Sequence, residues 1–428
     1  MGNSSYPSMA MANSQIVDVV MASHPIFDRK MNIAAYELLF RHCYGDECAI
    51  ISNYDDATNK IISDGFSLAS SRLGNVIKLT VNVGIQNIIS KNLLALPPSR
   101  VVFEIPSITT VSPELLDSCE ELKASGYKFL IDNYTVDNPC AEELIHLASY
   151  VKIPIGKTRG RLIAGIKKFI SKWDVKVIAS RIEDWESFEG CKALGFDYFQ
   201  GFFFARPKDI IGKKISSHKV SRLNLICMLS DENIELQKLV NAISADQAFS
   251  IRMLQFVNSA AFPLGTKVDS LARAASLVGL DSLKKWAMAA AISDLDASDK
   301  GIELSYMTIH GAIFLSKIAD FLSSQQFDHD TLYLLGLLHN LDAIMSMNMI
   351  DIVKDMPINS NLKQALMRDQ DEQLTQFLLL LDAICSDQWE HAREILHGIG
   401  VPLPRAAQLY MQAEHDTVNL LELTSSIS

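Results

Sequence analysis

The sequence predicts an α/β barrel followed by a separate all-α domain. In the first half, short apolar runs alternate with segments of helical spacing, which is typical of βα units around a parallel sheet. In the second half the strand-like runs disappear, and apolar residues recur at i, i+3 and i+4, the period of a helix. The length of 428 residues exceeds that of one ordinary core, so we expect two domains.

The predicted strands of the first half are short apolar runs, and the predicted helices lie between them. The strands are Ile16–Met21, Val76–Val83, Val101–Ile105, Lys128–Ile131, Tyr150–Ile153, Lys176–Ala179 and Tyr198–Gln200, and two of the helices are Pro113–Ser125 and Ala141–Ser149. These units suffice for a (β/α)₈ TIM-like barrel of ~200 residues, at the lower end of the size range of that fold.

The second half is predicted to be helical throughout. Its expected helices are Leu223–Leu229, Glu235–Ser244, Ala248–Asn258, Val268–Val278, Leu283–Leu295, Ser305–Leu322 and Thr331–Leu338. The segment Arg206–Val220, with Pro207, Gly212 and several lysines, indicates the boundary. We therefore expect a flexible tail over 1–14, the barrel over 15–207, a linker over 208–220 and the helical domain over 221–428.

Composition excludes several classes of protein. The net charge of −11 disfavours nonspecific binding to nucleic acid. The seven cysteines are odd in number and none has C-x-x-C spacing, which favours reduced thiols over disulfides or a zinc site. No apolar run approaches the ~20 residues of a membrane helix, and the polar start does not resemble a signal peptide. We expect a cytoplasmic protein that binds neither nucleic acid nor membranes.

Polar side chains recur at the ends of the predicted strands, where the active site of a βα barrel lies. They are Glu37, Asn82, Glu104, Asp132, Lys152 and Gln200. Carboxylate and amide oxygens converging there could hold hard divalent cations, and two cations could activate water for attack on a phosphodiester. The alternative is that each residue is a solvated strand end or a satisfied loop contact.

Six motifs in order carry a family resemblance that covers roughly residues 15–207. The run YELLFR at Tyr36–Arg41 resembles the signature of the EAL family of cyclic di-GMP phosphodiesterases, and its context HPIFDRKMNIAAYELLFR resembles the EAL–HDOD branch. The motifs VNVG, VFEI, IDNY, YVKI and FDYFQGFFFARP follow. The resemblance implies metal ligands at Glu37, Asn82, Glu104 and Asp132, functional roles for Lys152 and Gln200, and a contact from Arg41 to a phosphate of the dinucleotide.

Several positions depart from the pattern of that family. Asn133 stands where the family has a second Asp, Pro154 replaces an acid, and Ser180 replaces the Glu that would be a base or ligand, next to Arg181. A serine of ordinary pKa cannot deprotonate water as a carboxylate does. We therefore predict a vestigial site with no intact catalytic set and no cofactor.

The helical half resembles an HDOD domain. The resemblance rests on Asn258–Ser259–Ala260–Ala261–Phe262 after a helix, and on a later segment ending at Gly279. HDOD domains look like HD hydrolases that lost their metal site, and at the position of the His–Asp dyad this chain has His339–Asn340. A metal cluster of His310, His339 and His391 is the alternative to buried, hydrogen-bonded histidines, which we favour.

Together these features predict a bacterial signal-transduction protein that is not an enzyme. It would act through protein–protein interaction, with a barrel that either binds cyclic di-GMP weakly or only shapes protein contacts, and the sequence does not name the partner. The alternative is an active cyclic di-GMP phosphodiesterase that uses Mg²⁺ or Mn²⁺.

Overall fold

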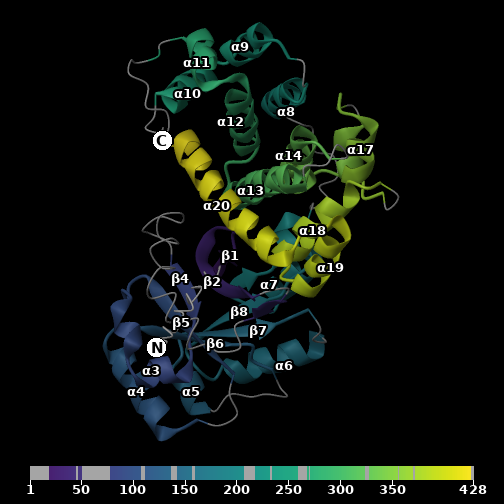
Figure 1. The fold of residues 1–428 in the computed structure, drawn as a ribbon. Helices are drawn as coiled ribbons and strands as arrows, with labels where there is room; N and C mark the ends of the chain where they lie inside the picture. Colours follow the sequence, from purple (N-terminus) through teal and green to yellow (C-terminus); the bar gives the residue numbers. More distant parts are fainter. Residues whose placement is uncertain are drawn as a thin grey trace, which may run out of the picture.

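The structure is a computed structural model with a barrel and a helical body that pack against each other (Figure 1). It describes residues 19–44, 47–50, 78–107, 111–135, 142–156, 160–206, 217–231, 234–258, 268, 270–322, 327–354, 356–369 and 372–425. The predicted tail over 1–14 lies outside these residues. Within the described part, no helix is long and apolar enough to cross a membrane.

Eight strands close into a barrel, and one further short strand, β3, pairs antiparallel with β2 outside it. The strands are β1 (Val19–Asp28), β2 (Ile33–Tyr44), β3 (Glu47–Ile50), β4 (Lys78–Asn82), β5 (Val101–Pro106), β6 (Lys128–Asp132), β7 (Tyr150–Pro154), β8 (Lys176–Ser180) and β9 (Tyr198–Gln200). Their order is β1-β9-β8-β7-β6-β5-β4-β2-β3, and a β1–β2 pairing closes the barrel.

The TIM-like barrel is confirmed, and its closing strand β1 runs antiparallel to both of its neighbours, β2 and β9. A tight turn causes this, because strands joined by a few residues pair antiparallel whereas a parallel pair needs a long crossover. The Asp28 side chain accepts hydrogen bonds from the backbone N–H groups of Lys30 and Asn32, at 2.7 and 2.9 Å. Met31 completes the turn with a φ of 68°.

Helices cover the outside of the barrel between the strands. They are α3 (Ile85–Ile89), η2 (Asn92–Ala95), α4 (Pro113–Ala124), α5 (Glu142–Leu147), α6 (Gly160–Ile170), α7 (Trp185–Ala193) and η3 (Phe202–Ala205). The start of α4 follows the local sequence, because the Ser112 side chain accepts from the N–H of Leu115 and Pro113 occupies the first turn. Asp184 caps α7 in the same way.

The second half is entirely helical in its described residues, as predicted. Its helices are α8 (Ser217–Leu229), α9 (Leu236–Ser244), α10 (Gln247–Val257), α11 (Leu271–Val278), α12 (Leu280–Ser293), α13 (Asp299–Leu322), α14 (His329–Leu338), α15 (Leu341–Met345), α16 (Met349–Val353), α17 (Ser360–Leu366), α18 (Thr375–Cys385), α19 (Trp389–Ile399) and α20 (Leu403–Ser425). The predicted domain limits at 207 and 221 stay predictions, since most of the linker lies outside the described residues.

Asn258 ends α10 and connects it to the segment before α11. Its side-chain amide donates to the carbonyls of Leu254 and Val268 and accepts from the N–H of Val268, each at 2.7 Å. One side chain therefore satisfies three backbone groups, which explains an asparagine at this turn.

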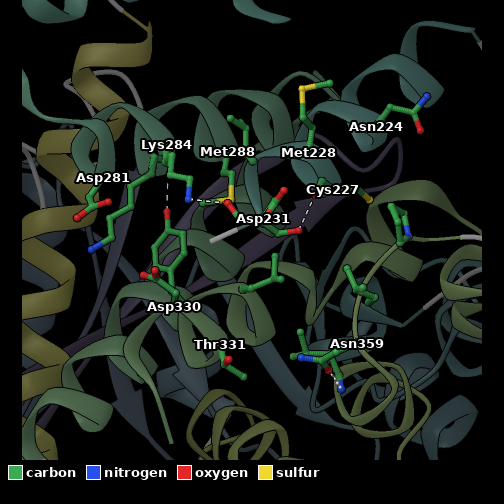
Figure 2. A pocket seen from close by; sticks show the side chains of 18 residues that line it. Asn224, Cys227, Met228, Asp231, Asp281, Lys284, Met288, Asp330, Thr331 and Asn359 are labelled. Atoms are coloured by element: carbon green, nitrogen blue, oxygen red, sulfur yellow. Dashed lines mark hydrogen bonds between the residues drawn. The ribbon is translucent and has the colours of Figure 1, made fainter. Parts of the chain in front are cut away.

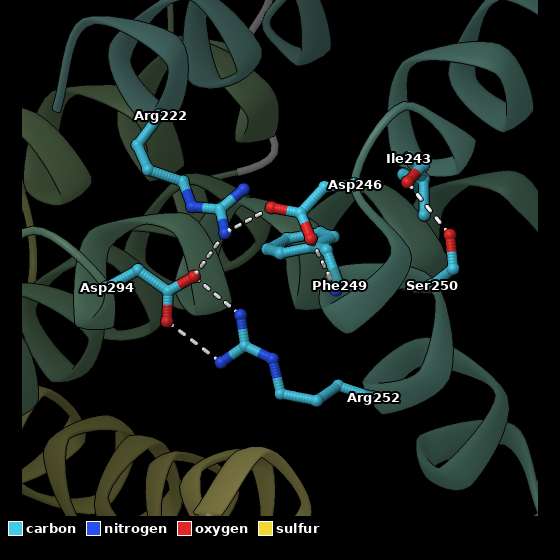
Figure 3. Close-up of polar contacts among 7 residues, drawn as sticks. All are labelled: Arg222, Ile243, Asp246, Phe249, Ser250, Arg252 and Asp294. Carbon is cyan, nitrogen blue, oxygen red and sulfur yellow. Dashed lines mark hydrogen bonds and ion pairs between the residues drawn. The ribbon is translucent and has the colours of Figure 1, made fainter. Parts of the chain in front are cut away.

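A network of two arginines and two aspartates connects α8, α10 and α12 (Figure 3). Arg222 lies 2.8 Å from Asp246 and 2.9 Å from Oδ2 of Asp294. Arg252 donates to the other carboxylate oxygen of Asp294, Oδ1, at 2.8 Å. Both guanidinium groups lie over the ring of Phe249. The network fixes the relative positions of these helices around an aromatic side chain.

The two domains meet along β2 and the start of α13. The backbone N–H of Ile33 donates to Asp299 at 2.8 Å, and the Tyr36 hydroxyl donates to Glu303 at 2.7 Å in a buried contact. The long helix α20 also contacts β1, β2 and β3, and Figure 1 shows it passing beside β1. The barrel therefore presents to the helical domain the outer face of the strand that carries Glu37.

Candidate functional site

The predicted site residues share the inner face of the barrel. Side chains alternate across a strand, so residues two apart share a face. One apolar layer inside the barrel contains Val102, Leu130, Ile178, Tyr150 and Tyr198. Two residues further along the same strands come Glu104, Asp132, Ser180, Lys152 and Gln200, which form a polar layer above the apolar one.

Lys152 occupies the centre of this layer, among three carboxylates. Its ammonium lies 2.6 Å from Glu104, 3.1 Å from Glu37 and 3.8 Å from Asp132. The side chains of Lys152 and Glu104 are 3% and 0% exposed, so water screens these charges little. The structure thus brings four of the predicted site residues into one buried charge cluster.

Neutral groups complete the hydrogen bonding of the carboxylates. Gln200 donates to one oxygen of Glu37 at 2.6 Å, and Asn82 donates to the other at 3.2 Å. Glu37 itself lies in the middle of β2, not at its end as predicted, because β2 continues past the barrel to pair with β3. Its inward orientation, rather than a strand end, places it in the site.

Two residues of the site were missed in the sequence. The Thr80 hydroxyl donates to Glu104, and His24 lies directly across from Glu37 on β1. The signal for Thr80 was available, because it is two residues before Asn82 and so shares its face. His24 could not be found in this way, because the antiparallel course of β1 is not evident locally.

Burial and crowding of charge shift the pKa values of the cluster in opposite directions. Burial acts to raise the pKa of Glu37, but the charges of Lys152 and His24 and the hydrogen bond from Gln200 outweigh it and lower the pKa to about 2. Burial raises the pKa of Glu104 to about 8, and the charge of Glu37 adds to this against the attraction of Lys152. One ammonium cannot compensate three buried carboxylates, so Glu104 retains its proton most readily.

The pKa values of Asp132 and Lys152 are set by the same balance of burial and neighbouring charge. Burial raises the pKa of Asp132, reinforced by Glu37 and opposed by Lys152. Burial acts to lower the pKa of Lys152, but the three carboxylates raise it above its ordinary range. The ammonium is therefore a fixed positive charge at the centre of the site.

The substituted positions lie together on the β6–β8 sector of the barrel. Pro154 and Ser180 are register partners on β7 and β8, and Asn133 directly follows β6. Asn133 and Arg181 both have left-handed backbones, with φ of 52° and 57°. The retained acids lie on β2, β5 and β6, whereas Pro154 and Ser180 place no carboxylate at these positions of β7 and β8.

The oxygen donors that the resemblance assigns to a metal contact one another and Lys152. Among the described residues, no three His, Cys, Asp or Glu side chains form a group that could hold a metal ion. The Lys152 ammonium occupies the space that the carboxylates share, and the β7–β8 side offers Ser180 and Pro154 in place of acids. The backbone of Arg41 lies in β2, but its side chain falls outside the described residues.

His310 and His339 are hydrogen-bonded, and the histidines among the described residues do not form the alternative metal cluster. His339 contacts Asp382 on α18 at 2.7 Å, and His310 contacts the carbonyl of Tyr410 at 3.0 Å. His391 lies apart, with its side chain 52% exposed. Asn340 donates to Thr308 across the helix pair.

Comparison with known proteins agrees with this architecture. The EAL domain family matches residues 67–207, and the HDOD domain family matches residues 217–377. The uncharacterized protein YuxH of Bacillus subtilis is 27% identical over 410 residues, covering 94% of this chain and 99% of that protein. The cyclic di-GMP phosphodiesterase CdgJ of Vibrio cholerae is 24% identical over 404 residues, covering 92% and 91%.

A solved EAL domain protein from Listeria monocytogenes aligns with a TM-score of 0.36 and 18% identity, covering 44% of this chain and 88% of that one. Barrel, helical domain and family matches occur in the same order along the sequence. The chain carries an EAL domain followed by an HDOD domain.

Proposed function

We propose that the EAL barrel of this protein does not hydrolyse cyclic di-GMP and that the chain transmits signals by binding. The observation that carries the proposal is the one-sided site. Ser180 occupies the inner polar layer at the end of β8, where the resemblance calls for a carboxylate, and Asn133 and Pro154 flank it. At these three positions neither a serine, an asparagine nor a proline could deprotonate water as a carboxylate does.

The geometry of the retained residues supports a structural and binding role for them. Glu37, Glu104 and Asp132 all direct oxygens to Lys152, and the amides of Asn82 and Gln200 bind Glu37. These contacts hold the polar side chains of the mouth in fixed positions. A barrel of this kind suits weak cyclic di-GMP binding or the shaping of protein contacts with the HDOD domain.

A second candidate is residual phosphodiesterase activity. The name of the Vibrio cholerae relative favours it, as does the survival of Glu37, Asn82, Glu104 and Asp132. If it holds, Mg²⁺ or Mn²⁺ would supply the activated water, and these four residues would hold the cation.

The test is hydrolysis of cyclic di-GMP by the full chain with Mg²⁺ or Mn²⁺, combined with calorimetric titration of the dinucleotide. We expect no linear dinucleotide product, because a missing base alone costs about 10²–10⁴ in rate. Glu37→Ala is the control. Product formed at enzyme-like rates by the unmodified chain, and lost in Glu37→Ala, would overturn the proposal in favour of the second candidate.

A further inference from the structure

A cavity of about 570 Å³ lies in the HDOD domain between α8, α12, α14 and the start of α17 (Figure 2). Its volume is within the range of pockets that hold small molecules. Every residue that lines it belongs to the helical domain, so it is separate from the barrel site. Its apolar walls include Met228, Met288 and Leu334.

Lys284 on α12 is the polar group that distinguishes this cavity. The residue is 8% exposed, and its ammonium donates to the backbone carbonyl of Asp231 at 2.9 Å. Among the described residues this is its one hydrogen-bond partner, and no carboxylate lies within the 4.0 Å of an ion pair. An ammonium has three donors, so two remain for another acceptor.

The Asp231 carbonyl offers only partial compensation for this charge. It lies two residues past the end of α8 and also accepts the backbone N–H of Ile234 at 3.2 Å, so it offers a partial negative charge rather than a full one. A buried cation is costly unless a full opposite charge pairs with it. An anion entering the cavity would supply that charge.

The cavity lining carries further charges of both signs besides Lys284. Lys285, half-buried, lines the same cavity and contacts His329 at 2.7 Å. The three acidic residues of the lining are all exposed, and Figure 2 shows Asp281 and Asp330 toward one side, away from the Lys284 contact with Asp231. The interior therefore attracts one negative charge, whereas the acidic rim repels ligands that carry several.

We propose that this cavity binds an amphipathic monoanion. Its anionic head would pair with Lys284, and its apolar body would lie along Met228, Met288 and Leu334. The acidic rim disfavours multiply charged ligands such as a dinucleotide, so this site is independent of the function proposed for the barrel.

The test is calorimetric titration of the full-length protein with three ten-carbon probes that differ only in their head group. Decanoate and decyl sulfate, both monoanions, should bind at least about tenfold more tightly than neutral decanol. Equal affinity for decanoate and decanol would overturn the proposal without recourse to any variant, as would the absence of binding at millimolar decanoate.

Two matched variants locate the site. Lys284→Gln keeps a donor for the Asp231 carbonyl but removes the charge, and it should weaken decanoate binding about tenfold or more while leaving decanol unchanged. Lys238→Met, at an exposed position on α9, removes the same charge from the surface and should bind like the wild type. A folded Lys284→Gln protein that binds decanoate with wild-type affinity would contradict the assignment.

Discussion

The inner layer of the barrel and the His339–Asn340 position of the helical domain hold their polar groups in different ways. In the barrel, three carboxylates and Lys152 remain as a buried cluster with strongly shifted pKa values. In the helical domain, His339 pairs with Asp382, whose side chain is 45% exposed, and Asn340 contacts Thr308.

The difference shows how burial decides what a retained polar group does. Charges enclosed in a barrel depend on one another, so removing Lys152 leaves the carboxylates without their cation. A pair at the edge of a helical domain is screened by water and contributes little. We expect the barrel cluster to dominate both the stability and the pH dependence of the protein.

The largest effect should follow from Lys152→Met. The variant leaves the carboxylates of Glu37 and Glu104 buried without their cation, so we expect a loss of roughly 3–5 kcal/mol in the free energy of unfolding, measured with urea. Lys176→Met is the control, since the Lys176 side chain is 60% exposed in its pair with Asp197 and should cost less than about 1 kcal/mol. Equal losses would refute the contrast between the buried cluster and a surface pair.

The next largest effect should be the pH dependence that Glu104 gives to the free energy of unfolding. Folded Glu104 keeps its proton up to about pH 8, whereas an ordinary Glu releases it near 4.5. Its contribution to stability is therefore complete below pH 4.5 and is lost as the pH rises through 8, by roughly 2–4 kcal/mol.

Glu104→Gln has no ionisable group at this position. Its free energy of unfolding should therefore fall less than that of the wild type between pH 4.5 and 8. Urea unfolding at several pH values measures this. Glu121→Gln, with a side chain 62% exposed, is the control that should follow the wild type. Parallel curves for wild type and Glu104→Gln would show that Glu104 is ionised in the folded state.

Asn258→Leu should produce a smaller loss, in the helical domain. The substitution leaves three backbone groups without their partner, which we expect to cost roughly 1–3 kcal/mol in urea unfolding. Asn241→Leu, at an exposed position of α9, provides the comparison. An unchanged midpoint for Asn258→Leu would mean that the turn does not depend on the amide.

Asp382→Asn should have the smallest effect. Burial acts to raise the pKa of Asp382, but the charges of His339 and Arg368 and their hydrogen bonds outweigh it and lower the pKa. The contribution of Asp382 to stability is therefore present above its ordinary pKa of 3.8 and is lost as the pH falls through the lower pKa of the folded state. Because the side chain is half exposed, we expect less than about 1 kcal/mol at neutral pH, converging with the wild type in acid. A loss as large as that of Lys152→Met would remove the distinction between the two regions.

The sequence alone determined the two-domain plan and most of the inner polar layer. Strand and helix periods are local properties, and alternation along a strand specifies which residues share a face. This is why Glu104, Asp132, Lys152 and Gln200 could be predicted together, and why Asn258 could be assigned to a turn. The substitutions Asn133 and Ser180 were equally visible in the sequence.

Only the tertiary structure decided which of these groups meet. Closure of the barrel by an antiparallel β1 brings His24 to Glu37 and places Lys152 among three acids from other strands. The pairing of His339 with Asp382, and the cavity at Lys284, likewise join helices that are distant in the sequence. Contacts of this kind depend on how elements close and pack in three dimensions, and the local pattern carries no record of them.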